Sequence, residues 1–157
     1  MPGVVALDDT GAHATLRIRA ARVGDAGDVA RLLAFLGYPC SQSDAAERIT
    51  TVLAEPRQHL LVAERDGEVC ALVSVYALYS LAHGGELARI TAMVVAPEAQ
   101  RCGIGRRLLR EAEGVARRTG IARIEVTSNT RRGEAHAFYR CCGYSDDSAR
   151  FVKLLGD

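Results

Sequence analysis

The sequence lacks the features that would place it in a membrane or send it across one. No stretch approaches the roughly 18 consecutive apolar residues of a membrane-spanning helix. The first ten residues, M-P-G-V-V-A-L-D-D-T, have neither the basic start nor the long apolar core of a signal peptide. We therefore expect a cytoplasmic protein with no membrane partner.

Cysteine pairs with a recognisable spacing are also missing. The five cysteines are odd in number, and none stands in a C-x-x-C motif. Reduced thiols are the better interpretation than disulfides or zinc ligands, so no metal is expected. Cys102 lies among cationic residues at the start of a helix, which makes it a candidate nucleophile. No histidine lies near it in the sequence to act as its base.

The chain has little net charge and few aromatic residues. The formal charge is +1 and aromatic residues make up 5% of the chain. Binding to nucleic acid through the arginines of the helix expected from residue 104 was considered, but this balance disfavours it. The 157 residues, 48% of them apolar, are enough for the core of one domain. We expect a loose tail over residues 1–14 and a single domain over residues 15–157.

Two common phosphate-binding loops are absent. No Gly-Lys pair exists for a nucleotide-hydrolase loop, and G-I-G at 103–105 is followed by R-R-L, without the third glycine of a dinucleotide fingerprint. Residues 90–109 nevertheless follow a pattern of apolar strand, turn at Pro97, glycine loop and helix. Glycines allow a ligand to approach the backbone closely. The first amides of a helix have no partner within it and attract anions. The stretch therefore predicts a site for a phosphate or pyrophosphate.

Periodicity and turn residues predict the other elements. Asp25 and Ser43 are expected to cap two helices, which end at Gly37 and before Pro56. Asp66-Gly67 is a hairpin signal. Strands are expected at residues 16–20, 60–64, 69–78, 87–95, 121–128 and 150–155. The order β-α-α-β-β-β-α-β-α-β-β indicates an α/β protein with a mixed sheet and helices on both faces.

Several motifs resemble those of the GNAT superfamily of N-acetyltransferases. Q-R-C-G-I-G at 100–105, after V-V-A-P, is similar to the family's acetyl-coenzyme A loop, [QR]-x-x-G-x-[GA]. A-H-A-F-Y-R-C-C-G-Y at 135–144 resembles its last motif. R-x-x-A-H-x-F-Y, the closing R-F-x-K-x-L and L-L-A-F-L-G-Y-P near residue 35 look like the branch that includes aminoalkylphosphonate N-acetyltransferases. The resemblance covers about residues 16–155.

The resemblance implies a GNAT-like fold and a cosubstrate. The strands at 87–95 and 121–128 should splay apart, helped by a β-bulge in the first, and receive the pantetheine arm of acetyl-coenzyme A like an added strand. The implied cosubstrate-binding residues lie on that strand, the loop and the last helix: Met93, Val94, Val95, Gln100, Arg101, Cys102, Gly103, Ile104, Gly105, Arg106, Asn129, Arg132, Phe138 and Tyr139.

The implied reaction is acetyl transfer to a primary amine of a small molecule, by direct attack in a ternary complex. Peptide or protein N-acetylation and a non-catalytic acyl-coenzyme A sensor are the alternatives, and a homodimer is one possible assembly. The amide of Met93 should stabilise the oxyanion and Tyr139 should protonate the leaving thiolate. Packing is the alternative role for Tyr139.

The general base departs from the family pattern. The strand positions that often carry it are Arg89 and Thr91, and neither is a base near neutral pH. Glu86, His83 or a chain of water molecules are the substitutes, and capture of the neutral amine without a base is the other alternative. Glu86 is equally well explained as a solvated carboxylate. Arg89 is instead a candidate clamp for a carboxylate or phosphonate on the acceptor, because guanidinium matches the geometry of both. Thr91 and Tyr38 are the other expected acceptor-binding residues.

Overall fold

The computed structural model describes residues 4–7, 13–127, 133–146 and 150–156. Its elements are β1 (Val4–Leu7), β2 (His13–Ala20), α1 (Ala26–Leu36), α2 (Gln42–Ala54), β3 (Gln58–Arg65), β4 (Glu68–Ser80), β5 (Gly85–Val95), α3 (Ile104–Arg118), β6 (Ile124–Val126) and α4 (Gly133–Cys141). Short 3₁₀ turns at Val23–Asp25 and Pro97–Ala99 precede α1 and follow β5.

The chain divides into two compact units, Met1–Glu125 and Val126–Asp157. The first holds the strands β1 to β5 with α1, α2 and α3, and the second holds α4. The single domain expected over residues 15–157 stays a prediction. Within the described residues, no helix is both long and apolar enough to cross a membrane.

Six strands form one mixed sheet in the order β1-β2-β3-β4-β5-β6. The neighbouring pairs from β1 to β5 are antiparallel. Asp66 and Gly67, with φ of 54° and 81°, join β3 to β4. Two left-handed residues are what a tight hairpin turn requires, so the expected hairpin is confirmed. β5 and β6 are joined through α3, the kind of crossover that parallel neighbours need.

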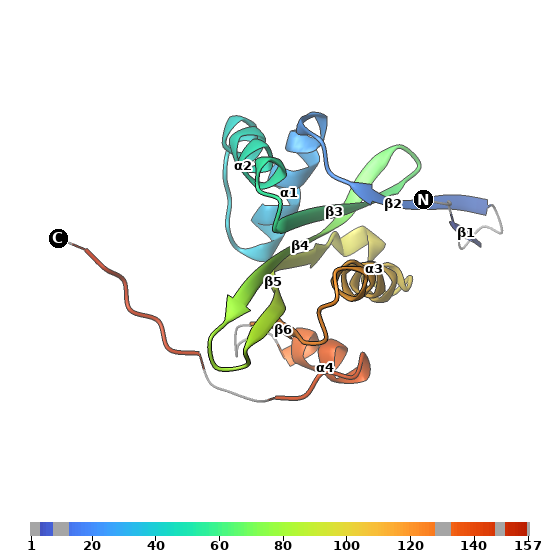
Figure 1. Ribbon diagram of the computed structural model, residues 1–157. Helices are drawn as coiled ribbons and strands as arrows, with labels where there is room; N and C mark the ends of the chain where they lie inside the picture. The colour runs from blue at the N-terminus through green and yellow to red at the C-terminus, as the bar shows by residue number, and fades with distance from the viewer. Residues whose placement is uncertain (1–3, 8–12, 128–132, 147–149, 157) are drawn as a thin grey trace. The chain divides into compact units, whose positions relative to one another are not determined.

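Helices cover both faces of the sheet in the first unit, as expected (Figure 1). α1 packs on β4 and β5, α2 packs on β3, and α3 packs on the other face against β3, β4 and β5. The side chains that are most completely buried come from these layers: Leu32, Ile49, Val62, Leu72, Leu108 and Leu109. This core fixes β5 and the start of α3, which carry the candidate site.

The cap of α2 lies two residues earlier than expected. Ser41, not Ser43, is the N-cap residue. Its hydroxyl accepts a hydrogen bond from the amide of Asp44 at 2.9 Å, and the Asp44 carboxylate accepts one from the amide of Ser41 at 3.3 Å. Ser43 has Ala46 three residues later and cannot form this reciprocal pair.

The two ends of the chain differ from the predicted strand order. Residues 4–7, expected in a loose tail, form β1 and pair with β2. Residues 150–156, expected to contain a closing strand, have no regular structure, and Phe151 and Leu154 are 93% and 90% exposed. The prediction of a closing strand is therefore wrong for the described residues. β-propensity describes how well a side chain fits a pleated surface, and a strand also needs a neighbour to pair with.

The strand after α3 is shorter than the predicted residues 121–128. β6 begins at Ile124 because the amide of Ile121 still bonds to Ala116 at the end of α3, at 2.9 Å. Ile121 is buried there. Ser128 lies outside the described residues.

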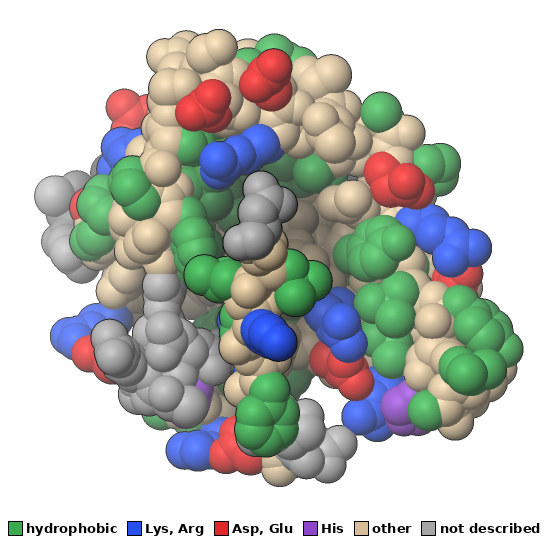
Figure 2. Space-filling view, turned by 90° about the vertical axis from the view of Figure 1, so that its left-hand side faces the viewer, with side chains coloured by type: hydrophobic (Ala, Val, Ile, Leu, Met, Phe, Trp, Pro, Cys, Tyr) green, Lys and Arg blue, Asp and Glu red, His purple; other side chains and the backbone are tan. Residues whose placement is uncertain are grey.

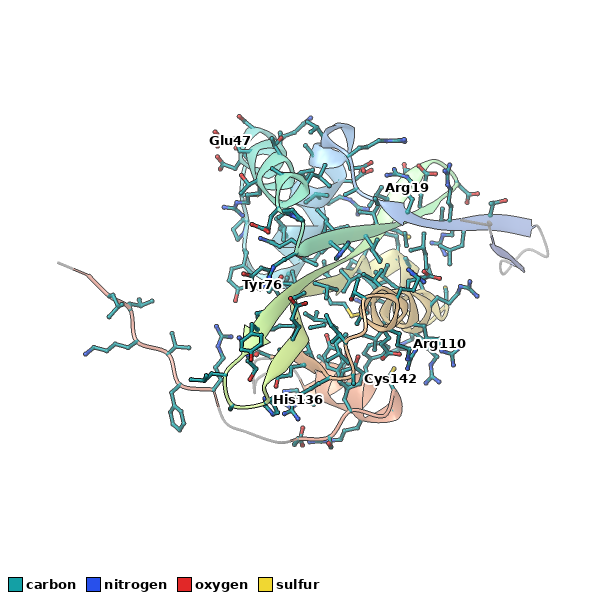
Figure 3. The ribbon with its side chains drawn as sticks, viewed as in Figure 1. Arg19, Glu47, Tyr76, Arg110, His136 and Cys142 are labelled. Carbon is teal, nitrogen blue, oxygen red and sulfur yellow. The ribbon has the colours of Figure 1, made fainter. Side chains whose placement is uncertain are left out.

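A buried ion pair joins β2 to the start of α1. Arg19, labelled in Figure 3, donates to both carboxylate oxygens of Asp25 at 2.8 and 2.9 Å. It also donates to Glu64 on β3 at 3.2 Å. The side chains of Arg19 and Asp25 are only 9% and 7% exposed. Asp25 is the N-cap residue of α1, as expected, but its carboxylate makes no cap hydrogen bond because Arg19 and the amide of Arg22 occupy it. Arg19 holds the pKa of Asp25 below its usual range.

Candidate active site

β5 carries a bulge at Thr91. Ile90 pairs with Val75 and Ala92 pairs with Ser74, so Thr91 has no register partner on β4. Its hydroxyl donates to the carbonyl of Ser74 at 3.3 Å. The bulge implied by the family resemblance is thus confirmed in this strand, and it lies at Thr91 itself.

The backbone of Met93 and Val95 faces away from β4. The amide of Ala96 donates to the carbonyl of Cys70 on β4 at 2.8 Å. Successive residues of a strand direct their peptide groups to opposite edges. Val95, and Met93 two residues before it, therefore face the edge shared with β6. The Gln100 side chain donates to the Val95 carbonyl at 3.1 Å, which is consistent with this direction.

The bulge is what gives Met93 and Val95 this orientation. On the other side of Thr91, the amide of Ala88 donates to the carbonyl of Arg123 at the β6 edge, at 2.9 Å. Plain alternation from Ala88 would turn Met93 and Val95 toward β4. The extra residue reverses the alternation, so that both present an N–H and a C=O to the same edge as Ala88. An extended ligand can pair with these groups as an added strand does.

The glycine loop follows directly from this strand. Gly103 is the N-cap residue of α3, with φ of 78° and no side-chain cap. The amides of Ile104, Gly105 and Arg106 form the first turn and have no partner inside the helix. A β-carbon added at Gly103 would meet no protein atom within 4 Å, so the loop is open on this side. Arg101, with φ of 65°, and the exposed side chain of Cys102 complete the loop.

Arg89, the candidate acceptor clamp, already holds a carboxylate. Its Nη2 donates to Oε1 of Glu125 at 3.0 Å, and Nε of Arg123 donates to the other oxygen, Oε2, at 3.0 Å. Arg123 first, and then Arg89, hold the pKa of Glu125 below its usual range. Tyr76, which is labelled in Figure 3, lies on β4. It is opposite Arg89 in the β4–β5 register, and so on the same face of the sheet.

The structure does not bring Glu86 together with Arg89. The two are three residues apart in a regular part of β5, so their side chains point to opposite faces. Glu86 forms an ion pair with Arg57 at 3.4 Å and lines a cavity with His59 beside the end of α3. His83, the other predicted substitute base, lies in the turn between β4 and β5 and pairs with the Ser80 hydroxyl at 2.8 Å.

The remaining predicted residues have different placements. Val94 has its backbone turned toward β4, unlike its neighbours. Tyr38 follows α1 and is 61% exposed. In the second unit, Phe138 and Tyr139 lie edge to face on α4, with ring centroids 5.3 Å apart. Asn129 and Arg132 lie outside the described residues. Within the described part of the chain, no group of three or more His, Cys, Asp or Glu could hold a metal ion.

Glu125, Arg123 and Tyr76 lie beside Arg89 or its partner, and the sequence did not predict this arrangement. Glu125 contacts Arg89 from 36 residues away, through the crossover of α3. The alternation R-I-E-V at 123–126 could have shown Arg123 and Glu125 on one face of a strand. The alternation does not show that Arg123 and Glu125 lie beside β5.

The described strand, bulge and loop are the candidate site, and the family of the chain indicates its chemistry. Residues 29–144 match the Acetyltransferase (GNAT) family. The chain belongs to this family and is an N-acetyltransferase. Members of the family use an acyl-coenzyme A cosubstrate. The capless start of α3 and the outward-facing backbone of Met93 and Val95 fit its pyrophosphate and pantetheine parts.

Among proteins of known function, the chain is similar to the aminoalkylphosphonate N-acetyltransferase of Salmonella typhimurium. The two are 36% identical over 103 residues, 66% of this chain and 67% of the relative. A GNAT family acetyltransferase from Staphylococcus aureus has a similar structure, with a TM-score of 0.76 and 23% identity over 89% of this chain and 98% of that one. A transcriptional regulator from Bacillus halodurans reaches a TM-score of 0.82 at 21% identity, over 89% and 99% of the two chains. These two similarities concern the fold alone.

Proposed function

We propose that this chain transfers the acetyl group of acetyl-coenzyme A to the primary amine of a small molecule that also carries an acid group. The main observation is the backbone of Met93 and Val95, turned by the Thr91 bulge toward an edge that leads to the Gly103 loop. An arm bound along this edge places its thioester near the amide of Met93. One such donor to the oxyanion typically contributes a factor of ~10²–10³ in rate.

The amine attacks the thioester directly in a ternary complex, and its proton passes to water. Glu86 is an unsuitable base because it is paired with Arg57 on the face opposite Arg89. An alkylammonium has a pKa of ~10, so the acceptor must bind as the small fraction that is a free amine near neutral pH. The positive Arg89 nearby favours that neutral form. Arg89 also offers an acid group on the acceptor two parallel hydrogen bonds.

The acceptor class is tested by measuring coenzyme A release with a panel of amines. We expect aminoalkylphosphonates and amino carboxylates to give kcat/KM values at least about tenfold above neutral amines and peptide N-termini, since one charged hydrogen-bonding contact contributes about 1.4 kcal/mol or more. Intersecting initial-velocity lines support direct attack, and parallel lines would point to an acetylated Cys102. Turnover of peptides alone favours the peptide acetyltransferase, and acetyl-coenzyme A binding without turnover favours the sensor.

Tyr139 is the proposed acid that protonates the departing thiolate. Tyr139→Phe keeps the ring and removes the hydroxyl, so the rate constant should fall by about 10²-fold while the melting temperature changes little. Tyr144→Phe is the matched control, because its ring lies 5.7 Å from that of Tyr139 in the same cluster. Single-turnover rates measure the step. Equal rates for the two variants would return Tyr139 to a packing role.

A cytoplasmic location and a homodimer also remain proposals. The largely exposed apolar side chains of Phe151, Leu154 and Leu155 support a contact with a second copy. Analytical sedimentation measures the assembly, and a monomer at tens of micromolar would exclude the dimer. Cell fractionation measures the location.

A further inference from the structure

Three charged side chains near the bulge form a row of alternating sign. Glu125 lies between Arg89 and Arg123, with one carboxylate oxygen on each. Glu125 is 29% exposed, and the two arginines are 46% and 44% exposed. The three side chains together carry a net charge of +1. Arg89 lies two residues before Thr91 on β5, which is about 7 Å at ~3.3 Å per residue. Basic and acidic side chains are interspersed on the surface in this way on the face shown in Figure 2.

The Glu125 carboxylate takes up a donor of Arg89 that an acid group on an acceptor would compete for. Its contact uses one donor of Arg89, Nη2, at 3.0 Å, and a carboxylate or phosphonate held by two parallel hydrogen bonds would need a second donor beside it. An incoming anion must therefore replace Glu125 on Arg89 or share Arg89 with it. Replacement does not leave Glu125 unpaired, because Nε of Arg123 still holds Oε2 at 3.0 Å.

We propose that Arg89, Glu125 and Arg123 act as a partner-exchange cluster that sets selectivity for acidic acceptors. This proposal rests on the proposed function. The acid group of the acceptor takes the place of Glu125 on Arg89, and Arg123 keeps Glu125 compensated. Glu125 is an internal competitor that weakens the binding of acids, and Arg123 limits that competition. All three are specificity-determining residues, and none takes part in a bond-making step.

Two opposing effects of Glu125 can be compared in size. Its charge repels an acceptor anion about 4–6 Å away, which changes affinity by roughly threefold to fivefold even at the dielectric constant of water. Its contact with Arg89 also orders that side chain, but an exposed ion pair contributes little. Repulsion should therefore dominate when Glu125 is removed.

Glu125→Gln keeps the size and one oxygen acceptor while removing the charge. We expect the KM for acidic amines to fall about threefold to tenfold, with kcat and the KM for a neutral amine unchanged. Arg123→Met should have the opposite effect, because among the described residues Glu125 then keeps Arg89 alone as its ion-pair partner. In the double variant the effect of Arg123→Met should largely disappear, since the two residues act through one contact. Arg117→Gln on α3 is the control for losing one positive charge elsewhere.

A second measurement does not depend on turnover of an acidic amine. Methylphosphonate, tested as an inhibitor of neutral-amine acetylation, should inhibit the Glu125→Gln variant at about threefold to tenfold lower concentration. An unchanged or higher inhibition constant in that variant overturns the exchange proposal. If wild type acetylates only neutral amines and Arg89→Ala has no effect on any acceptor, the proposed function fails too. If Arg89→Ala impairs acidic acceptors but Glu125→Gln does not improve them, only the exchange proposal fails.

Discussion

Gly103→Asp should abolish the stabilisation of the protein by acetyl-coenzyme A. At about 100 times its dissociation constant, the cosubstrate should add ~2.7 kcal/mol to the free energy of unfolding of the wild type. For a domain of this size that raises the melting temperature by roughly 5–10 °C. The β-carbon of the new side chain would meet no protein atom within 4 Å beyond its chain neighbours. Loss of the shift would therefore come from a carboxylate placed against the phosphates of the ligand.

The hairpin glycine Gly67 provides a matched control for this substitution. It has φ of 81°, close to the 78° of Gly103, and its β-carbon would also meet nothing within 4 Å. Gly67→Asp therefore introduces similar backbone strain far along the chain from the loop. Thermal melting with and without acetyl-coenzyme A should show a full shift in Gly67→Asp and none in Gly103→Asp. A full shift in both variants would place the cosubstrate elsewhere.

Arg19→Ala should strongly destabilise the fold. It leaves the Asp25 carboxylate, 7% exposed, without its main partner. Removing one partner of a buried ion pair typically costs about 3–5 kcal/mol. The melting temperature should fall by roughly 6–20 °C. Arg17→Ala on the same strand is the control, because Arg17 is exposed and its loss should change the melting temperature by only a degree or two.

The pH dependence separates this ion pair from simple loss of packing. Arg19 lowers the pKa of Asp25 in the folded protein, so the pair stabilises the fold above the unfolded pKa of about 3.9. That contribution is lost as the pH falls through the lower, folded-state pKa. The difference in stability between wild type and Arg19→Ala should therefore narrow below about pH 4. A constant difference, followed by denaturant unfolding, would show that Arg19 acts through packing alone.

Local chemistry explains why much of the first unit could be predicted from the sequence. Asp66-Gly67 permits few turns other than a tight hairpin, and Gly37 ends α1 with φ of 103°, as expected for a left-handed cap. The loop at 100–105 combines a strand end, glycines and a helix start within a few residues. Each of these depends on neighbours in the sequence, so no tertiary information is needed.

The parts that could not be predicted depend on residues far apart in the chain. Arg89 was expected to face the acceptor, but its partner Glu125 lies on another strand, 36 residues away. Asp25 has the right residue type for a cap, yet Arg19 uses its carboxylate instead. The segment at 150–155 has strand-like composition, but pairing requires a neighbour that composition does not specify.

The Thr91 bulge constrains the number of residues in β5 more than it constrains the identity of their side chains. Any residue at position 91 that tolerates the bulge preserves the direction of the following peptide groups, because the proposed contacts with the cosubstrate come from the backbone. Deleting one residue between Ala88 and Met93 would shift that phase by one. The N–H and C=O groups of Met93 and Val95 would then point toward β4. Those of Val94 would point toward the proposed cosubstrate edge in their place. In β5, the number of residues between Ala88 and Met93 should therefore matter more for cosubstrate binding than the identity of their side chains.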